Sequence, residues 1–476
     1  MTFDIRVLST YGPRECGIAT FTGNLLTALG NLTGEVGAMR VAAIDKDKLH
    51  YKFPVDLVID QYNPDSWKSR TSAMLTRAVE TENPTLFVFQ HEFGLDPEGT
   101  GGPDKEGRGH HYVDMAEEIS NTGAFKRGDF VTLTQLHTVL TNPNDYQRRT
   151  LQELAKYSDA LIVTTSSAID TLASVYDIDS SKVAHIHHGI RKRDSSEHDR
   201  LNVKKEIGLE GIMLSLTLGL KSHDKGIQFG IPSYAKVVEN SFTPEQRENA
   251  VWVVAGKCHP EFVGKPYDRY QNMMKKALER SKLKWCEVSS FEEFKELDVR
   301  KYDIVFLDSF LNETNLIRMY TASNLMILPY LEQEQVSSGI LADTVGSGRV
   351  AIVGKSVYSV ELLYDNRITP YEKGLIGIGD PHARGFLVDP GKPSIEQMAK
   401  AIHYALSRGP ERLSMERRAS SHGDSMRQSY VANDLMNLAK WCRTDKQTPK
   451  GRGPVFEFDH NSLYERAVSK ILAARK

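Results

Sequence analysis

The sequence predicts an α/β protein with two doubly wound parallel sheets. Short apolar runs of strand length alternate with helical patterns along the chain, which is typical of strands joined by helices in a parallel sheet. The alternation is interrupted by a polar interval at residues 191–205 and then restarts. We therefore expect two Rossmann-like halves with a cleft between them, one at residues 1–205 and the other at residues 206–425.

In the first half, short apolar runs of buried-strand length predict the strands. They are residues 3–9, 39–44, 55–59, 86–89, 131–136, 160–163 and 183–186. Amphipathic spacing predicts helices at residues 18–29, 69–81 and 146–156. Residues 96–111 are rich in glycine, proline and charge, so we expect a mobile loop there.

In the second half, the same patterns predict strands at residues 213–218, 251–255, 304–307, 325–328 and 350–353, and helices at residues 267–280, 313–322, 394–407, 426–443 and 463–474. The most complete unit is the strand–loop–helix–strand segment at residues 324–354. Pro329 ends its first strand, and Ser337-Ser338-Gly339 opens the short helix, with serine as a good N-cap. Gly346 and Gly348 stop that helix before the next strand begins.

The composition argues against several classes of protein. The 476 residues carry a formal net charge of −2, whereas nucleic-acid-binding domains are usually strongly basic. Four cysteines lie far apart without a C-x-x-C pair, which favours reduced thiols in a cytoplasmic protein. The N-terminus has no signal-peptide pattern, and no apolar run approaches the ~20 residues of a membrane span. The sequence does not predict an oligomeric state.

Polar residues follow several strands of the first half where each strand ends. The first strand leads into a loop with Arg14 and Gly17, and later strands lead to His91-Glu92, to His137 and to His188. Carboxyl ends of parallel strands meet at one edge of a sheet, where ligands bind, so these residues predict a pocket. Each could also be an ordinary turn or a structural histidine. No H-E-x-x-H motif or Cys/His ligand spacing is present, so we expect no metal site.

In the second half, lysine and glycine residues are placed to bind an anion. Gly219 ends one strand, and Lys225-Gly226 begins the helix that follows. A lysine there can neutralise a phosphate, and the N–H groups of a helix start at Ser337-Ser338-Gly339 favour the same charge. The alternative is a solvated lysine and an ordinary α/β turn. The P-loop, the G-x-G-x-x-G fingerprint after the first strand and the G-x-S-x-G elbow are all absent, which argues against three large enzyme classes.

Taken together, these segments resemble the retaining GT-B glycosyltransferases, specifically a bacterial-type subgroup of glycosyltransferase family 4. The resemblance covers most of the chain. It is carried by PRECGIATFTGNLLTAL at residues 13–29, QHEFG at residues 90–94, LHT at residues 136–138, HHG at residues 187–189, LGLKSHDKGI at residues 218–227, PYLEQEQVSSGILADTVGSGRVAIVG at residues 329–354 and VELL at residues 360–363.

The resemblance implies that the second half holds a nucleotide-sugar donor, such as a GDP- or UDP-sugar, and that the first half holds the acceptor. It implies transfer with retention, no metal and no cofactor. Residues 426–476 would then include a helix that crosses back to the first half, followed by a tail. The implied catalytic residues are His137, Lys225 and Glu334. The implied donor-binding residues are Gly17, Gly219, Lys225, Gly226, Gln335, Ser337, Ser338, Gly339 and Asp343, and the implied acceptor-binding residues are Arg14, His91, Glu92 and His188.

The chain departs from the family pattern at three positions. Leu220 stands where the family commonly has an arginine, and Gln335 and Asp343 stand where it has a pair of glutamates. Glu361 aligns with a later glutamate. We therefore expect a retaining glycosyltransferase that acts on a hydroxyl acceptor. Two alternatives stay open, namely a GT-B phosphorylase or sugar-nucleotide epimerase, and a degenerate glycosyltransferase that serves as a binding or scaffold subunit.

Overall fold

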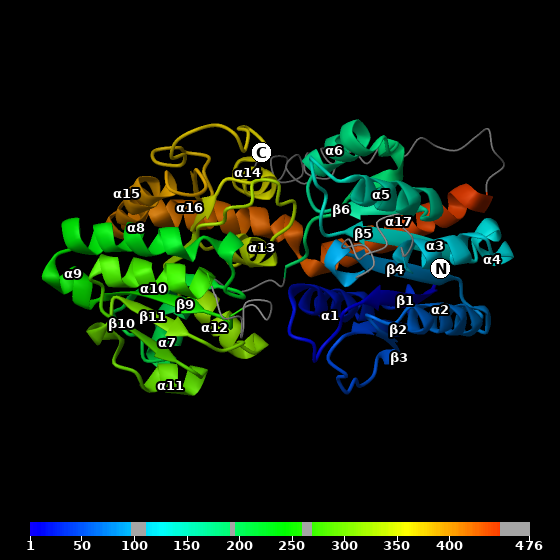
Figure 1. The fold of residues 1–476 in the computed structure, drawn as a ribbon, viewed down its shortest axis with the longest axis horizontal. Helices are drawn as coiled ribbons and strands as arrows, with labels where there is room; N and C mark the ends of the chain where they lie inside the picture. The colour runs from blue at the N-terminus through cyan, green and yellow to red at the C-terminus, as the bar shows by residue number, and fades with distance from the viewer. Residues whose placement is uncertain (97–110, 191–195, 259–268, 448–476) are drawn as a thin grey trace, which may run out of the picture.

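The computed structural model describes residues 1–96, 111–190, 196–258 and 269–447. Within these residues the chain forms two α/β halves that lie side by side (Figure 1), each built on a seven-stranded parallel sheet. The loop expected at residues 96–111, except for its two end residues, lies outside the described residues, and so does the helix expected at residues 463–474. None of the helices in the described part of the chain is long and apolar enough to span a membrane.

The sheet of the first half has the strand order β3-β2-β1-β4-β5-β6-β7. In chain order the strands are β1 (Phe3–Ser9), β2 (Val36–Asp45), β3 (Val55–Asp60), β4 (Thr85–His91), β5 (Phe130–Leu136), β6 (Ala160–Val163) and β7 (Val183–His185). The helices are α1 (Gly17–Gly30), α2 (Pro64–Val79), α3 (His111–Ser120), α4 (Gly123–Arg127), α5 (Asp145–Tyr157) and α6 (Ser167–Tyr176). Buried side chains fill the space on both faces of the sheet, which is why its strands read as continuous apolar runs.

The sheet of the second half has the order β10-β11-β9-β8-β12-β13-β14. Its strands are β8 (Met213–Leu218), β9 (Ala250–Ala255), β10 (Trp285–Val288), β11 (Ile304–Leu307), β12 (Leu325–Leu328), β13 (Ala351–Gly354) and β14 (Phe386–Val388). Its helices are α7 (Glu197–Glu206), α8 (Ile227–Asn240), α9 (Pro244–Glu248), α10 (Arg269–Ser281), α11 (Phe291–Glu296), α12 (Glu313–Ala322), α13 (Gly339–Gly346), α14 (Val357–Tyr364), α15 (Ser394–Ser407) and α16 (Gly409–Gly423).

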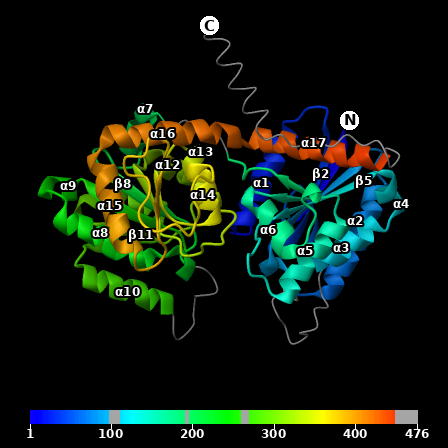
Figure 2. The same ribbon diagram turned by 90° about the horizontal axis from the view of Figure 1, so that it is seen from above.

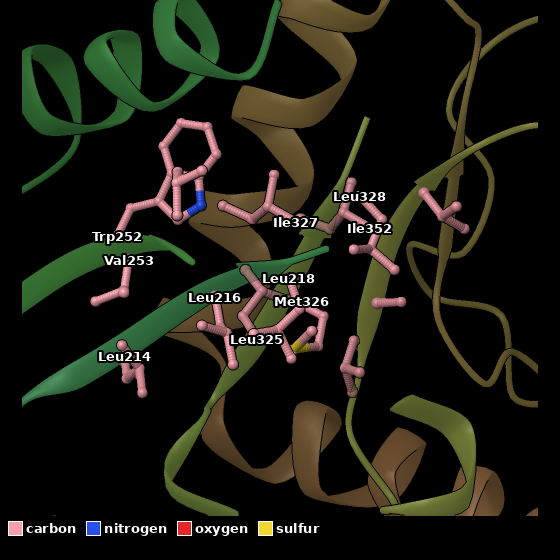
Figure 3. Close-up of a cluster of buried hydrophobic side chains, with 14 of the residues drawn as sticks. Leu214, Leu216, Leu218, Trp252, Val253, Leu325, Met326, Ile327, Leu328 and Ile352 are labelled. Carbon is pink, nitrogen blue, oxygen red and sulfur yellow. The ribbon is translucent and has the colours of Figure 1, made fainter. Parts of the chain in front are cut away.

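The core of the second half shows why the central strands were predicted accurately. Leu325 to Leu328 on β12 are fully buried, and Figure 3 shows them beside Leu216 and Leu218 of β8 and Trp252 of β9. A strand that is covered on both faces needs apolar side chains at every position. The run Leu325–Leu328 is therefore continuous, and the proline that follows ends the strand.

Every strand predicted from the sequence is present, with its ends shifted by a few residues at most, but β10 and β14 were not predicted. Each lies at an edge of the sheet. On β10 the side chain of Trp285 is exposed and only Val288 is buried. An edge strand with so few buried side chains shows no clear apolar run, and β14 has only three residues.

The polar interval at residues 191–205 was expected to separate the halves, but much of it is helix α7. Ser196 caps this helix by accepting a hydrogen bond from the Asp199 N–H. Its buried side chains are Arg200 and Lys204 instead of apolar residues, and a carboxylate of Glu416 pairs with Arg200 at 2.8 Å. Because charged residues form the buried face, the sequence shows no hydrophobic periodicity.

The last described helix, α17 (Gln428–Gln447), starts near the second half and runs across the first (Figure 2). Leu435, Met436 and Ala439 of α17 are buried in the same cluster as Leu25 and Leu29 of α1. The final helix therefore completes the core of the first half. The exact domain boundaries at residues 205 and 425 stay a prediction.

Candidate active site

The carboxyl ends of the two sheets face each other. Lys257, which follows β9, forms an ion pair with Glu15, which follows β1, at 3.0 Å. The Thr164 hydroxyl, just after β6, donates to the Val336 carbonyl in the loop after β12, at 2.8 Å. Val336 is also buried in the core of the first half. In parallel sheets the functional side chains lie at the carboxyl ends of the strands, so the candidate site lies where the two halves meet.

Two histidines of the first half lie together at this junction. The rings of His137 and His188 both pack edge-on against Phe21 of α1, with centroids 5.3 and 5.0 Å away. His188 lies next to the start of α13 in the other half, since a methyl group added at Gly339 would be 3.4 Å from its ring. Burial lowers the pKa of His188, although the charge of Asp343 on α13 opposes this shift. Residues from β5, β7 and α13 therefore meet at one place.

His137 is held by a buried glutamine. Its Nε2 atom lies 2.7 Å from Oε1 of Gln90, the last residue but one of β4, which is fully buried. Burial lowers the pKa of His137 to about 3, and the charges of His188 and His91 add to the effect. The ring is therefore neutral at physiological pH, so it can accept or donate a hydrogen bond but supplies no positive charge.

In the second half, Lys225 and Ser338 lie against the same side chain. The Lys225 ammonium is 4.8 Å from the centre of the Tyr330 ring. Burial raises the pKa of Tyr330, and the nearby Lys225 and Ser338 side chains oppose this shift. Burial works against the charge of Lys225, but Tyr330 and Asp224 outweigh it and raise the pKa of Lys225. Lys225 therefore stays protonated beside the helix start, and the two predicted anion-binding elements are neighbours.

The backbone at this place requires glycine. Gly226 has a φ of +63°, and a Cβ there would lie 1.9 Å from the Pro329 carbonyl oxygen. Gly219 also has a positive φ, but a Cβ there would meet only Ile340 at 3.8 Å. Gly17, at the first turn of α1, has no atom within 4 Å of an added Cβ, so this loop faces open space. Gly226 is thus fixed by close packing, whereas Gly17 leaves room for a ligand.

The loop after β12 is held by contacts that the sequence did not suggest. One carboxylate oxygen of Glu334 accepts a hydrogen bond from the Tyr371 hydroxyl at 2.6 Å, and the other is buried without a partner among the described residues. The Gln335 carbonyl accepts from the Tyr358 N–H. Ser337 is partly buried, and Ser338 caps α13 by accepting from the Leu341 N–H.

Three of the residues expected to bind an acceptor, Arg14, His91 and Glu92, lie at strand ends of the first half. Arg14 donates to the Ile44 carbonyl and to Oε1 of Gln61, at 2.9 and 3.0 Å. Its guanidinium is therefore held at the ends of β2 and β3. Burial raises the pKa of Glu92, while the Thr138 hydroxyl, which donates to Glu92 at 2.7 Å, opposes this shift.

His91, the next predicted acceptor residue, packs its ring against Phe93 and Tyr112. Its backbone carbonyl accepts from the His137 N–H at 3.1 Å, so His91 lies beside His137 as well as beside Glu92. His188, predicted to share the acceptor role, lies against Phe21 and next to α13. The sequence could not tell His188 from the other three, because its pattern shows only that each residue lies at or near a strand end.

Three further residues at the junction were given no role from the sequence. Gln90 holds His137, Tyr330 lies between Lys225 and Ser338, and Ser166 contacts Glu361 of α14 across the halves. Both oxygens of Glu361 accept from the Ser166 N–H at 2.9 Å, at the start of α6. Gln90 stands directly at a strand end, a position that could have marked it. Nothing in the local sequence links Glu361 to Ser166.

Two other observations bear on what the site can bind. A surface hollow of about 190 Å³, lined by Met213, Glu245 and His403 among others, lies at the amino ends of β8 and β9 and therefore away from the junction. Within the described residues, no group of three or more His, Cys, Asp or Glu side chains is arranged to hold a metal ion.

Two Rossmann-like halves whose strand ends face each other form the GT-B architecture, and similarity to solved structures supports this assignment. HepE of Anabaena in complex with UDP and glucose is 11% identical, with a TM-score of 0.60, over 92% of this chain and 99% of that chain. Sucrose-phosphate synthase of Thermosynechococcus elongatus is 12% identical, with a TM-score of 0.61, over 93% and 100%.

A glycosyltransferase of Rickettsia africae is 13% identical, with a TM-score of 0.57, over 93% of this chain and 98% of that chain. No family model and no curated protein sequence matches this chain. Identities of 11–13% establish the GT-B fold and nothing finer. The resemblance to glycosyltransferase family 4 stays a prediction.

Proposed function

We propose that this protein is a glycosyltransferase that moves a sugar from a nucleoside-diphosphate sugar to a hydroxyl group of an acceptor. The observation that carries the proposal is the grouping of Lys225, Tyr330 and Ser338 at the start of α13, with His188 of the other half against Gly339. A cation and a helix N-terminus at the junction of two GT-B halves suit a diphosphate. HepE, a protein of similar structure, was solved with UDP, with UDP and glucose, and with UDP-glucose.

The chemistry would depend on the leaving group. The bond between the anomeric carbon and the phosphate oxygen breaks, and its electron pair leaves with the diphosphate. The acceptor hydroxyl forms the new bond on the same face and passes its proton to the departing phosphate. Lys225 and the α13 N–H groups would stabilise the charge that develops there. His137 would hydrogen-bond the sugar, and Glu334 and Gln335, in the loop beside Ser338, would complete the donor site. In this proposal the reaction proceeds with retention and without a metal.

The acceptor would bind in the first half, close to Gly17. The group of Arg14, His91 and Glu92 lies at the ends of β2, β3 and β4 and offers a cation, an imidazole and a carboxyl. Burial raises the pKa of Glu92, and its carboxyl oxygens can accept a hydrogen bond from a hydroxyl. We propose a polyhydroxylated acceptor on these grounds.

The test compares Lys225→Ala with the matched surface variant Lys236→Ala, whose lysine pairs with Glu396 on the second half. A panel of nucleoside-diphosphate sugars is first screened by calorimetry, and products are analysed with the donor that binds. Loss of a charge-stabilising group typically lowers turnover by ~10²–10³. Lys225→Ala should show this loss and Lys236→Ala should not. Wild-type turnover in Lys225→Ala would refute the assigned role.

The other two functions have distinct outcomes in the same experiments. A phosphorylase would form product with inorganic phosphate in place of a nucleotide, and an epimerase would change the sugar nucleotide without any acceptor. The scaffold alternative is favoured by Gln335, which carries an amide where the family has a carboxylate. No binding to any nucleotide of the panel would support it.

A further inference from the structure

Gln90 is the one side chain that hydrogen-bonds an imidazole nitrogen of His137 within the described residues. Oε1 of the Gln90 amide faces this nitrogen at 2.7 Å, and an amide oxygen only accepts, so in this orientation of the amide the Nε2 atom of His137 carries the proton. The neutral ring has one proton, and its Nδ1 atom therefore bears a lone pair. The contact with Gln90 thus selects one of the two neutral forms of the ring.

The surroundings keep both groups in place. Gln90 is fully buried at the end of β4, and its Nε2 atom has no partner in the described part of the chain. The Phe21 ring packs edge-on against His137 at 5.3 Å, which restricts rotation of the imidazole. Nδ1 of His137 has no hydrogen-bond partner among the described residues, and the ring is only partly buried. The free lone pair is therefore the group that this residue offers to a ligand.

We propose that Gln90 is a positioning residue that holds His137 as the neutral Nε2–H form, so that Nδ1 accepts a hydrogen bond from a hydroxyl of the bound sugar. A lone pair repels phosphate and carboxylate oxygens, so the ligand atom at this point has to be a donor. The diphosphate is thereby directed toward Lys225 and the sugar hydroxyl toward His137. The proposed function is needed at one point only, where the hydroxyl group is identified as part of a sugar.

The first test measures the ring form directly and needs no substrate. In protein labelled with ¹⁵N-histidine, long-range ¹H–¹⁵N spectra separate protonated from unprotonated ring nitrogens. The signals of His137 are identified by their loss in His137→Gln. We expect a protonated Nε2 and an unprotonated Nδ1, unchanged down to about pH 5, since the pKa of His137 is lowered to about 3. A protonated Nδ1 in the wild-type protein would overturn the proposal.

Three variants then isolate the part played by Gln90. Gln90→Leu should change the ratio of the two ring forms by up to about tenfold, the effect of one hydrogen bond. Gln90→Glu keeps an acceptor and adds a charge, so it should keep the Nε2–H form but let the ring become protonated at a higher pH. The control is Gln135→Leu, whose glutamine is buried opposite Gln90 on β5 and does not bond to His137.

The outcomes are distinct from those that test the enzyme activity. If Gln90→Leu and Gln135→Leu give the same spectrum of His137, Gln90 does not select the ring form and the proposal is wrong. If Gln90→Leu does not fold, Gln90→Glu still decides, because an unchanged pKa of His137 in that variant would contradict direct contact. With an identified donor, Gln90→Leu should lower binding of the nucleotide sugar more than binding of the free nucleotide, whereas Gln135→Leu should lower neither.

Discussion

Removal of the Glu361 carboxylate should loosen the junction between the two halves. Glu361 lies on α14 of the second half and its side chain is 14% exposed. Its two oxygens accept from the Ser166 N–H at 2.9 Å, and one accepts from the Ser166 hydroxyl at 3.0 Å. The side chain of Ser166, the N-cap residue of α6, makes no capping hydrogen bond of its own. The carboxylate therefore serves as the cap of a helix that belongs to the other half.

The expected magnitude follows from these contacts. A hydrogen bond to a charged group contributes about 1.5–3 kcal/mol, and a helix cap contributes about 0.5–2 kcal/mol. Because these terms overlap, we expect Glu361→Ala to cost about 2–4 kcal/mol of local stability. A value of ~2.8 kcal/mol corresponds to about a 100-fold faster exchange of the Ser166 amide hydrogen. Glu361→Gln keeps an oxygen acceptor and loses the charge, so its effect should be smaller.

Hydrogen exchange of the Ser166 amide is the measurement, with Glu396→Ala as the control. Glu396 pairs with Lys236 on the surface and its side chain is 66% exposed, so its loss should change stability by less than about 1 kcal/mol and leave Ser166 unaffected. Equal exchange rates at Ser166 in Glu361→Ala and Glu396→Ala would refute the reasoning.

Three further predictions concern packing and charge. Gly226→Ala should lower the free energy of unfolding in urea by about 3 kcal/mol or more, since it adds a clash with a backbone carbonyl to the strain of a positive φ. Gly219→Ala adds only the strain and should cost about half as much, so equal losses in the two variants would contradict the prediction. Burial, with the charge of a neighbouring arginine, lowers the pKa of Lys204 to about 7. Between that pKa and 10.5 the unfolded chain binds more protons than the folded chain, so the free energy of unfolding of the wild-type protein should rise by about 2 kcal/mol from pH ~7 to pH ~9. Lys204→Met should lose this rise, and the same dependence of stability on pH in both proteins would show that Lys204 is not the cause. Lys257→Ala breaks a half-exposed ion pair with Glu15, so it should change the free energy of unfolding by less than about 1 kcal/mol, and by even less in high salt. A larger loss would mean that the pair is shielded from solvent.

Local sequence predicted the elements of the candidate site better than their partners. Ser338 as a helix cap, Lys225 after a strand and the histidines at strand ends were all readable, because each follows from the residues directly beside it. The side chains that contact these residues could not be predicted from the local sequence. Gln90 is far from His137 along the chain, and Ser166 is farther still from Glu361.

What the sequence determined by itself is the two α/β halves and the central strands of each sheet. Those strands are buried on both faces, so every position must be apolar. The resulting continuous apolar run can be recognised in the local sequence alone. Helix α7 and strand β10 depended on the tertiary structure, since Arg200 is buried only because Glu416 pairs with it and Trp285 is exposed only because its strand lies at an edge. The tertiary structure alone brought Lys225 and Ser338 to Tyr330 and placed His188 against α13. Contacts between distant segments form only when the whole chain packs, and no local pattern records them.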